Sequence, residues 1–432
     1  MRESVFLALR TLRGRSGTAR YVRGAVAGIA LGLVPLVVVM EVSTGMIEGI
    51  TARLLEIGSH HLQASLPAAL SAEDLVAAAR TVEKLPAVRV ATAERQATVL
   101  LALSGRSAGV TLRCVDPVSF ARDEGLRRYL SVLEGSADLA RPRTVLISAA
   151  LARTLGARTG DEVMAVAGLG GETSLLPRVS RLTVAGIYET GYQELDKAVA
   201  YAPLADAETV LPPRSARTIL GVKVADPFAD LSIAAARVAE TLGPDARVSS
   251  WRDLERSRLA SFETTRWLLV LIMSLVAAVA AANVSSTVLM LVLERRQEIG
   301  ILLGIGARPA LLTRSFLLAG LAAAATGTVL GIAAGLLLAV NINGVIAVLD
   351  RLLNLASGLL DLARTPFTPE AGSGERLTLF QSAYYLQSIP VRVRALEVTA
   401  AAFGTLLVAC LAAWLPARRA GRLSPLEVLR RS

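Results

Sequence analysis

Few residues in this chain have the type and spacing that catalysis needs. One motif, Gly105-Arg106-Ser107-Ala108-Gly109, has the letters of the G-x-S-x-G nucleophile elbow. A nucleophile elbow connects a strand to a helix, whereas this motif lies between two strand-like runs, Ala97–Leu103 and Gly109–Val115. We therefore expect a hairpin turn, and a membrane-anchored hydrolase that depends on Ser107 stays open only as an alternative.

The remaining chemistry-bearing residues do not combine into a known site. The two histidines, His60 and His61, are adjacent, which excludes an HExxH zinc motif, and we expect no metal site. No G-x-x-x-x-G-K-[ST] loop occurs, so ATP and Mg²⁺ must be bound by another polypeptide. Asp123 and Glu124 have no evident apolar pocket, and we assign them to a solvated surface. The sequence thus predicts a non-catalytic chain without a cofactor of its own.

The composition indicates a membrane protein. The chain has 432 residues, of which 53% are hydrophobic and 19% charged, and its mean hydropathy is +0.52. A helix needs about 20 residues to cross a bilayer. Four apolar runs are long enough: Gly24–Met40, Trp267–Leu293, Ser315–Leu349 and Val398–Ala417. The first reaches the required length because its apolar character resumes after Glu41. We expect four membrane helices, with Glu41 near the outer edge of the first, where it can reach water.

The distribution of charge predicts the orientation. The net charge is +10, but three short segments alone hold 15 basic and four acidic residues, so the excess marks topology and not a nucleic-acid partner. Arginine-rich short loops stay in the cytoplasm, which places both termini and the loop 294–314 inside. A signal peptide within the first 47 residues is the alternative; no small-x-small cleavage site follows, and the later spans need an inside start.

These expectations divide the chain into nine parts. In order, they are the cytoplasmic N-terminus (1–23), the first span and stalk (24–57), the outer α+β domain (58–250), a stalk and the second span (251–293), a cytoplasmic loop (294–314), the third span (315–340), a second outer loop (341–397), the fourth span (398–417) and a cytoplasmic tail (418–432). The third apolar run is longer than one span needs, so we expect its end to lie along the interface.

The outer domain is predicted from alternating β-branched runs and helical stretches. The predicted strands are Ala97–Leu103, Gly109–Val115, Thr144–Ser148, Glu162–Ala167, Arg181–Ile187, Ala198–Ala202 and Thr218–Val224. The predicted helices are Ser71–Leu85, Ala149–Leu155, Leu204–Leu211 and Asp230–Leu242. Cys114 is expected as a small core residue, and Cys410 in the fourth span is too far away to pair with it.

Helical spacing of apolar residues continues beyond two of the spans. It extends after the first span to Gly58 and begins before the second span at Trp251. We expect two helical stalks here; loose interfacial loops are the alternative. Such helices would connect a membrane rearrangement to the outer domain.

The loop between the second and third spans carries a recognisable motif. Glu294-Arg295-Arg296-Gln297-Glu298-Ile299-Gly300-Ile301-Leu302, followed by Gly304-Ile305-Gly306-Ala307, resembles the cytoplasmic loop of FtsX-like (MacB-type, type VII) ABC transporter permeases. An amphipathic helix of this kind suits docking into a groove of a cytosolic partner. The resemblance implies an ATPase-docking site at Glu294, Arg295, Arg296, Glu298, Ile299, Ile301, Leu302 and Gly306.

Further stretches are similar to the lipoprotein-releasing (Lol-type) branch of these permeases. The most discriminating are Gly186–Asp196 and Tyr384–Val391, and Gly109–Pro117 also matches, although the family usually has glycine at Cys114. The resemblance implies four transmembrane helices in the bacterial inner membrane, with a MacB-like periplasmic α+β domain between helices 1 and 2. It also implies four partners: a cytosolic ABC ATPase dimer, a second permease copy or paralogue, an acylated lipoprotein, and a periplasmic lipoprotein carrier.

Two sites follow from this resemblance. We expect a substrate path between the first and second spans of two subunits, walled by Val34, Val38, Val42, Met46, Leu259, Phe262 and Leu269. The loop 168–178 lies where one permease subtype engages the carrier, and an ordinary hairpin is the alternative. Its expected contact residues are Gly168, Glu172, Leu175, Leu176 and Pro177. The stretch from Asn341 to Gln381 departs from the family pattern.

The function expected from these features is extraction of acylated lipoproteins from the outer leaflet of the inner membrane, driven by ATP hydrolysis in a partner subunit. Exposing each acyl methylene to water costs about 0.8 kcal/mol, so extraction needs external work and a sheltered path. The alternative is a mechanotransmission permease that controls a periplasmic partner, or efflux of another substrate, with the same architecture.

Overall fold

The computed structural model describes residues 16–168, 178–212, 216–364 and 390–420. The described residues form two compact units. We call the first the membrane unit, which takes residues 16–46, 262–364 and 390–420. The second, the sheet unit, takes residues 47–168, 178–212 and 216–261.

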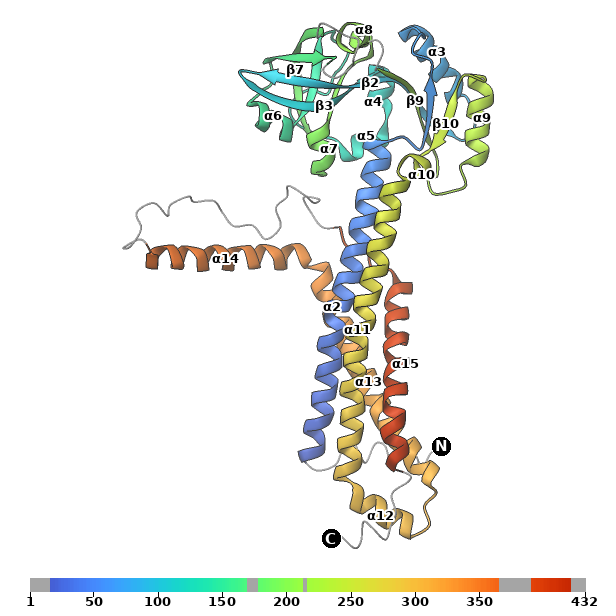
Figure 1. Cartoon of the computed structure of the whole chain (residues 1–432), viewed down its shortest axis with the longest axis vertical. Coiled ribbons are helices and arrows are strands. Elements are labelled where there is room, and N and C mark those ends of the chain that lie inside the picture. The colour runs from blue at the N-terminus through green and yellow to red at the C-terminus, as the bar shows by residue number, and fades with distance from the viewer. Residues whose placement is uncertain (1–15, 169–177, 213–215, 365–389, 421–432) are drawn as a thin grey trace. The chain divides into compact units, whose positions relative to one another are not determined.

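Four long apolar helices can each cross a membrane, as the sequence predicts (Figure 1). They are α2 (Ser16–Arg53), α11 (Arg256–Glu294), α13 (Pro309–Val340) and α15 (Ala395–Ala420). Helix α2 continues without a break to Arg53 and is followed by a π-helical turn, η1 (Leu54–Gly58), while α11 begins at Arg256. The predicted helical extensions of the first two spans are therefore confirmed, and loose loops at these places are excluded.

A stripe of glycines on α13 allows α2 to approach closely. A Cβ atom at Gly327, Gly331 or Gly335 would lie 2.9, 2.9 or 2.8 Å from the Cβ atoms of Ile29, Leu33 and Val37 of α2, respectively. The spacing of four residues places these glycines on one face of the helix. Because lipid removes the hydrophobic drive between helices, association depends on such close packing.

The sheet unit is built on one mixed sheet of ten strands (Figure 1). The strands are β1 (Leu62–Leu66), β2 (Val88–Leu103), β3 (Arg106–Val115), β4 (Ser131–Gly135), β5 (Thr144–Ser148), β6 (Glu162–Ala167), β7 (Arg178–Glu189), β8 (Val199–Pro203), β9 (Arg217–Val224) and β10 (Arg247–Ser250). Their order is β10-β1-β9-β2-β3-β8-β5-β7-β4, with β6 paired to β2 and β7. All seven predicted strands are confirmed, and β1, β4 and β10 are additional.

Short helices accompany the sheet. They are α3 (Ala72–Glu83), α4 (Pro117–Arg122), α5 (Glu124–Tyr129), α6 (Ala149–Leu155), α7 (Gln193–Ala198), η2 (Leu204–Asp206), α8 (Ala207–Val210), α9 (Ser232–Leu242) and α10 (Trp251–Leu254). Ser71 caps α3 by accepting from the backbone N–H of Asp74 at 3.0 Å, as its sequence position predicts. The membrane unit also contains α12 (Arg296–Gly304) and α14 (Ile342–Arg364).

The G-x-S-x-G motif forms the hairpin that the sequence predicts. Ser104 and Gly105 both have positive φ, 48° and 80°, and connect the paired residues Leu103 and Arg106 of β2 and β3. Two such residues make the tight loop that joins antiparallel strands. Ser107 lies within β3, so the motif lacks the strand-to-helix turn of a nucleophile elbow.

Cys114 on β3 is fully buried in the core of the sheet unit, as predicted. Burial raises the pKa of its thiol well above the usual range, so the protonated, unreactive form is favoured. The residue therefore packs as a small apolar side chain.

The glycine stripe yields a stability test. We expect Gly331→Ala to lower the stability of the membrane unit by about 1–3 kcal/mol, because the new methyl group collides with Leu33 and Ala30 of α2. Gly404→Ala on α15 is the matched control, since nothing lies within 4 Å of its Cβ position. Alanine favours helix at both positions, so the control should be neutral or stabilising.

The measurement is the apparent unfolding midpoint of the full chain in detergent. Equal midpoints for the two alanine variants would contradict the close packing of α2 on α13.

Candidate functional site

The predicted docking loop forms helix α12 and a defined turn. The N–H of Gly306 donates to the carbonyl of Leu303 at 3.1 Å, and that of Ala307 donates to the carbonyl of Leu302 at 3.0 Å. This pair of bonds is the Schellman closure, which requires positive φ at Gly306, where φ is 98°. Gly306 therefore ends the helix.

The docking residues lie on different sides of α12. Ile299 is buried in the core of the membrane unit, and Leu302 packs against that core. Ile301 is 52% exposed, while Glu298 is exposed and paired with Arg295 at 2.7 Å. Arg296 and Gly306 are exposed, as is Glu294 at the end of α11. The exposed surface of this loop therefore contains both charged and apolar side chains. It includes Ile305, which is 80% exposed and which the sequence did not single out as a docking residue.

The expected substrate-path residues are divided between the two units. Val34, Val38, Val42 and Met46 on α2 and Phe262 and Leu269 on α11 are half-buried residues of the membrane unit. Leu259 belongs to the sheet unit, where it packs against the apolar core. The same part of α11 exposes larger apolar side chains that were not predicted as wall residues: Trp267, Leu271 and Leu275, at 69%, 65% and 68%.

The expected carrier loop is only partly visible. Glu172, Leu175, Leu176 and Pro177 lie outside the described residues, while Gly168 follows β6 with a φ of 93°. At its base, Ala167 of β6 pairs with Arg178 of β7 in an antiparallel hairpin.

Glu41 differs from expectation. Its side chain has no solvent exposure, and its Oε2 accepts from the backbone N–H of Arg394 at 3.3 Å. Thr44, one turn on, donates to Glu397 at 3.1 Å. The prediction that Glu41 reaches water is wrong, because the segment leading into α15 covers it.

A cluster of buried charges surrounds the end of η1 in the sheet unit; sequence reasoning missed it. We call it the anchor cluster: Glu56, His60, Glu94, Arg113, Asp123 and Lys223. Arg113 of β3 makes two bonds of 2.7 Å to the carboxylate of Glu94 on β2. The same guanidinium donates to the carbonyls of Ile57 and Gly58, the latter at 3.3 Å.

Lys223 of β9 completes the anchor cluster. Its ammonium group donates to the carbonyl of Glu56, to the Glu56 carboxylate and to Asp123, at 2.8, 2.8 and 2.7 Å. The last carbonyls of a helix lack partners within the helix and carry partial negative charge. Arg113 and Lys223 therefore satisfy the end of η1, and each cation is in turn neutralised by buried carboxylates.

The two histidines pack beside these cations. Nδ1 of His61 accepts a hydrogen bond from the backbone N–H of Val224 at 3.0 Å. The other ring nitrogen, Nε2, lies 3.5 Å from a carboxylate oxygen of Glu56. Nε2 of His60 lies 3.0 Å from Arg113 and 3.2 Å from Glu94. A Cβ at Gly221 would lie 2.2 Å from the His60 ring, so only glycine fits there. The described residues contain no group of three or more His, Cys, Asp or Glu placed to hold a metal ion.

Asp123 corrects a sequence-based assignment. It is buried, caps α5 by accepting from the N–H of Leu126 at 3.0 Å, and pairs with Lys223. The prediction of a solvated surface is therefore wrong for Asp123 and holds for the exposed Glu124. The available signal was the charge of Lys223 and Arg113 inside otherwise apolar strands, which requires a buried partner.

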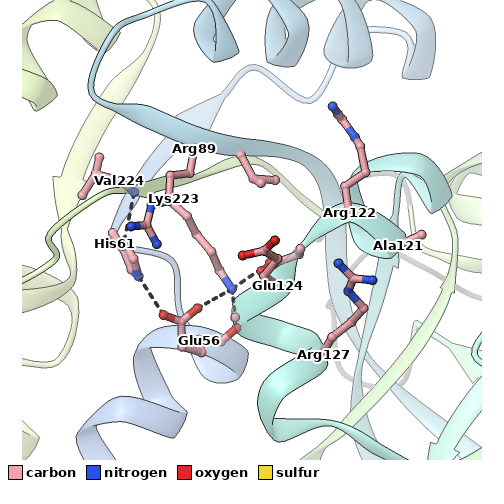
Figure 2. A pocket seen from close by; sticks show the side chains of 12 residues that line it. Glu56, His61, Arg89, Ala121, Arg122, Glu124, Arg127, Lys223 and Val224 are labelled. Carbon is pink, nitrogen blue, oxygen red and sulfur yellow. Dashed lines mark hydrogen bonds and ion pairs between the residues drawn. The ribbon is translucent and has the colours of Figure 1, made fainter.

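An open cavity of about 570 Å³ lies beside the anchor cluster (Figure 2). Glu56, His61 and Lys223 line one side, and Arg89, Arg122 and Arg127 point toward the same space. Arg122 also pairs with Glu83 at 3.0 Å. Because charged side chains dominate the lining, the cavity is a poor site for an acyl chain.

Two family models match the chain. Residues 24–241 match the MacB-like periplasmic core domain, and residues 270–425 match the FtsX-like permease C-terminal model. The chain is 26% identical over 436 residues to the lipoprotein-releasing system transmembrane protein LolC of Neisseria meningitidis serogroup B, covering 98% of each chain. It is 24% identical over 448 residues to LolE of Haemophilus influenzae, covering 99% of each chain. The periplasmic region of MacB from Actinobacillus actinomycetemcomitans matches 47% of this chain and 94% of its own length, at 14% identity and a TM-score of 0.32.

The anchor cluster predicts a large cost for losing one partner. We expect Arg113→Met to destabilise the sheet unit by about 3–5 kcal/mol, because the buried Glu94 then loses its cationic partner and keeps only its contact with His60. The double variant Glu94→Leu/Arg113→Met should recover part of this loss. Arg181→Met is the control, since the exposed Arg181–Glu162 pair, at 3.8 Å, should contribute about 0–1 kcal/mol. Fluorescence of the buried Trp251 provides the measurement, recorded during unfolding of the full chain with Trp267→Phe and Trp414→Phe so that no other tryptophan contributes.

The cluster also predicts a dependence on pH. Burial lowers the pKa of His60, so folding favours its neutral form, and stability should fall as the pH drops below the unfolded value of about 6.5. Burial alone would raise the pKa of Glu94, but Arg113 and the bond with His60 outweigh it and lower the pKa to about 2. Its contribution is complete above its unfolded pKa of about 4.3 and is lost as the pH falls toward 2.

The measurement is the unfolding midpoint of the full chain across this pH range, compared with that of His60→Gln. The variant should lose the upper step and keep the lower one. A midpoint that is flat between about pH 7 and 5 in the unaltered chain would contradict the assignment for His60.

Proposed function

Since this chain belongs to the FtsX-like, MacB-type permeases of ABC transporters, we propose that it extracts acylated lipoproteins from the outer leaflet of the inner membrane and delivers them to a periplasmic carrier. The supporting observation is the similarity to lipoprotein-releasing subunits, which extends over 98–99% of this chain and of theirs. Both termini would lie in the cytoplasm, as the arginine-rich segments favour.

Energy for this transport would come from a cytosolic ABC ATPase dimer. Exposing acyl chains costs about 0.8 kcal/mol per methylene, and the chain has no phosphate-binding loop to supply that work. Arg296, Glu298 and Ile301 are exposed groups of α12 that a partner groove could meet. The paired Arg295 holds the Glu298 carboxylate in place.

The acyl chains would travel along the membrane unit. Trp267, Leu271 and Leu275 present a broad apolar surface on α11 in a single chain. A second permease copy or paralogue facing this surface would enclose a path that excludes water. Val34, Val38 and Val42 on α2 remain our proposed wall on the other side, and Met46, Phe262 and Leu269 extend it.

The anchor cluster would transmit movement of α2 to the sheet unit. Helix α2 leads directly into η1, and Arg113 and Lys223 bind the carbonyls at the end of η1 to strands β3 and β9. A helix end held by several buried charge-assisted bonds cannot tilt without moving those strands. Mechanotransmission to a periplasmic partner, without movement of lipid, would use the same connection and is the second candidate.

Copurification separates these two candidates. The tagged chain, extracted from native membranes in mild detergent, is analysed by mass spectrometry for ATP-binding subunits and acylated polypeptides. An ATPase together with lipoproteins that are lost on adding ATP is the result expected for extraction. An ATPase with a wall enzyme or efflux component and no lipoprotein would overturn extraction in favour of mechanotransmission.

Charge reversal tests the docking surface. We expect Glu298→Lys to reduce copurification of the ATPase, because it places a second cation beside Arg295 and removes the exposed carboxylate. Glu298→Gln should have a smaller effect. Glu240→Lys, on the exposed side of α9, is the control for charge reversal at a distant site. An ATPase yield that is unchanged in Glu298→Lys would overturn the assignment of α12.

A further inference from the structure

Helix α14 has two chemically distinct sides. At 100° per residue, Val345, Val348, Leu352 and Leu355 fall on one side, and Asn354 falls on the other. Val348, Leu352 and Leu355 are 53%, 55% and 64% exposed. None of the buried core clusters of the described residues includes a side chain of α14. In the part of the chain that the structure describes, the apolar side is therefore mostly uncovered by protein.

The position of α14 in the chain places it at a membrane surface. Only Asn341 separates it from the end of the spanning helix α13, and the Asn341 side chain donates to the carbonyl of Leu337 at 2.8 Å. From Ser315, after the last charged residue of α13, to Val340, the helix rises about 39 Å. This length exceeds the hydrocarbon thickness of about 30 Å, so Asn341 comes where the chain has just crossed the core.

The exposed apolar surface of α13 leads into that of α14. Leu337 and Val340, in the last turn of α13, are 68% and 61% exposed. Those side chains suit contact with lipid, and Val345 begins the apolar side of α14 five residues after Val340. The two surfaces are thus nearly continuous along the chain, and α14 turns where the lipid headgroups begin.

The width of the apolar side distinguishes lipid from a second helix. The apolar residues between Ile342 and Leu355 cover about 180° of the helix, whereas a coiled-coil seam needs only a narrow stripe. The charges of the helix also balance, since Asp350 and Asp361 are matched by Arg351 and Arg364. A helix without excess positive charge has no electrostatic preference for anionic lipid.

We propose that α14 is a lipid-surface helix, which lies in the outer-leaflet interface with its apolar side in the acyl region and binds neutral lipid without requiring anionic headgroups. This assignment does not depend on what the transporter moves, so it can fail while lipoprotein extraction stands.

Spin labels on the full chain test the proposal. Single-cysteine variants are made in a background with Cys114→Ala and Cys410→Ala and placed in nanodiscs of phosphatidylcholine alone. The matched pair is Leu352→Cys on the apolar side and Asn343→Cys on the polar side, where Asn343 is exposed and lies two residues before Val345. Accessibility to oxygen, which concentrates in lipid, and to a water-soluble nickel chelate is measured at each site. Val329→Cys on α13, a position that is 67% exposed, and Glu240→Cys on α9 provide the lipid and water references.

The expected result is oxygen accessibility at Leu352 comparable to that at Val329, and nickel accessibility at Asn343 comparable to that at Glu240. Val348→Cys and Leu355→Cys should follow Leu352, which repeats the test if one variant is poorly folded. A Leu352 label as water-accessible as Glu240 would overturn the proposal. A label shielded from both reagents would show a protein occupant, such as a second copy, and would overturn it as well. Appearance of the lipid signal only with anionic lipid would overturn the neutral-lipid assignment.

Discussion

The sheet unit depends on the hydrogen bonds that satisfy the last backbone carbonyls of the helical turn η1 inside its core. The carbonyls of η1 point among strands, where water is scarce and unpaired polar groups are costly. Arg113 and Lys223 supply the missing donors, and Glu94, Glu56 and Asp123 balance their charge. Elements distant in sequence are therefore fixed together: η1, β2, β3, β9 and the start of α5. Removal of Arg113, Glu94 or Lys223 alone would leave a buried charge without its ion-pair partner, so these residues hold the junction in one arrangement.

In the membrane unit, α2 and α13 are held together by close apolar packing and not by buried charged groups. Helices α2 and α13 meet through glycines and aliphatic side chains, and their contact depends on shape and not on directed bonds. Shape-dependent contacts allow helices to shift by small steps at modest cost, whereas the charged cluster fixes a single arrangement.

The sequence predicted those parts of the fold that depend on local pattern. Long apolar runs specified the four spans, and alternating β-branched residues specified seven strands. Short or polar strands such as β4 carry too little pattern to be recognised. The anchor cluster was missed because its pairs are distant: Glu56 and Lys223 are 167 positions apart. Asp123 was assigned to the surface for the same reason, because its partner Lys223 is distant in the sequence.

The two units also differ in how well their surfaces could shelter an acyl chain from water. The cavity of the sheet unit is bordered by Arg89, Arg127 and the anchor cluster, so an acyl chain placed there would have to desolvate charged groups and would gain few apolar contacts. The extensive exposed apolar surface is on the membrane unit, on α11, α13, α14 and α15. At about 0.8 kcal/mol per methylene, an acyl chain would stay on that surface until another apolar surface receives it. On the proposed function, the acyl chains would pass from one apolar surface to another without entering the charged cavity.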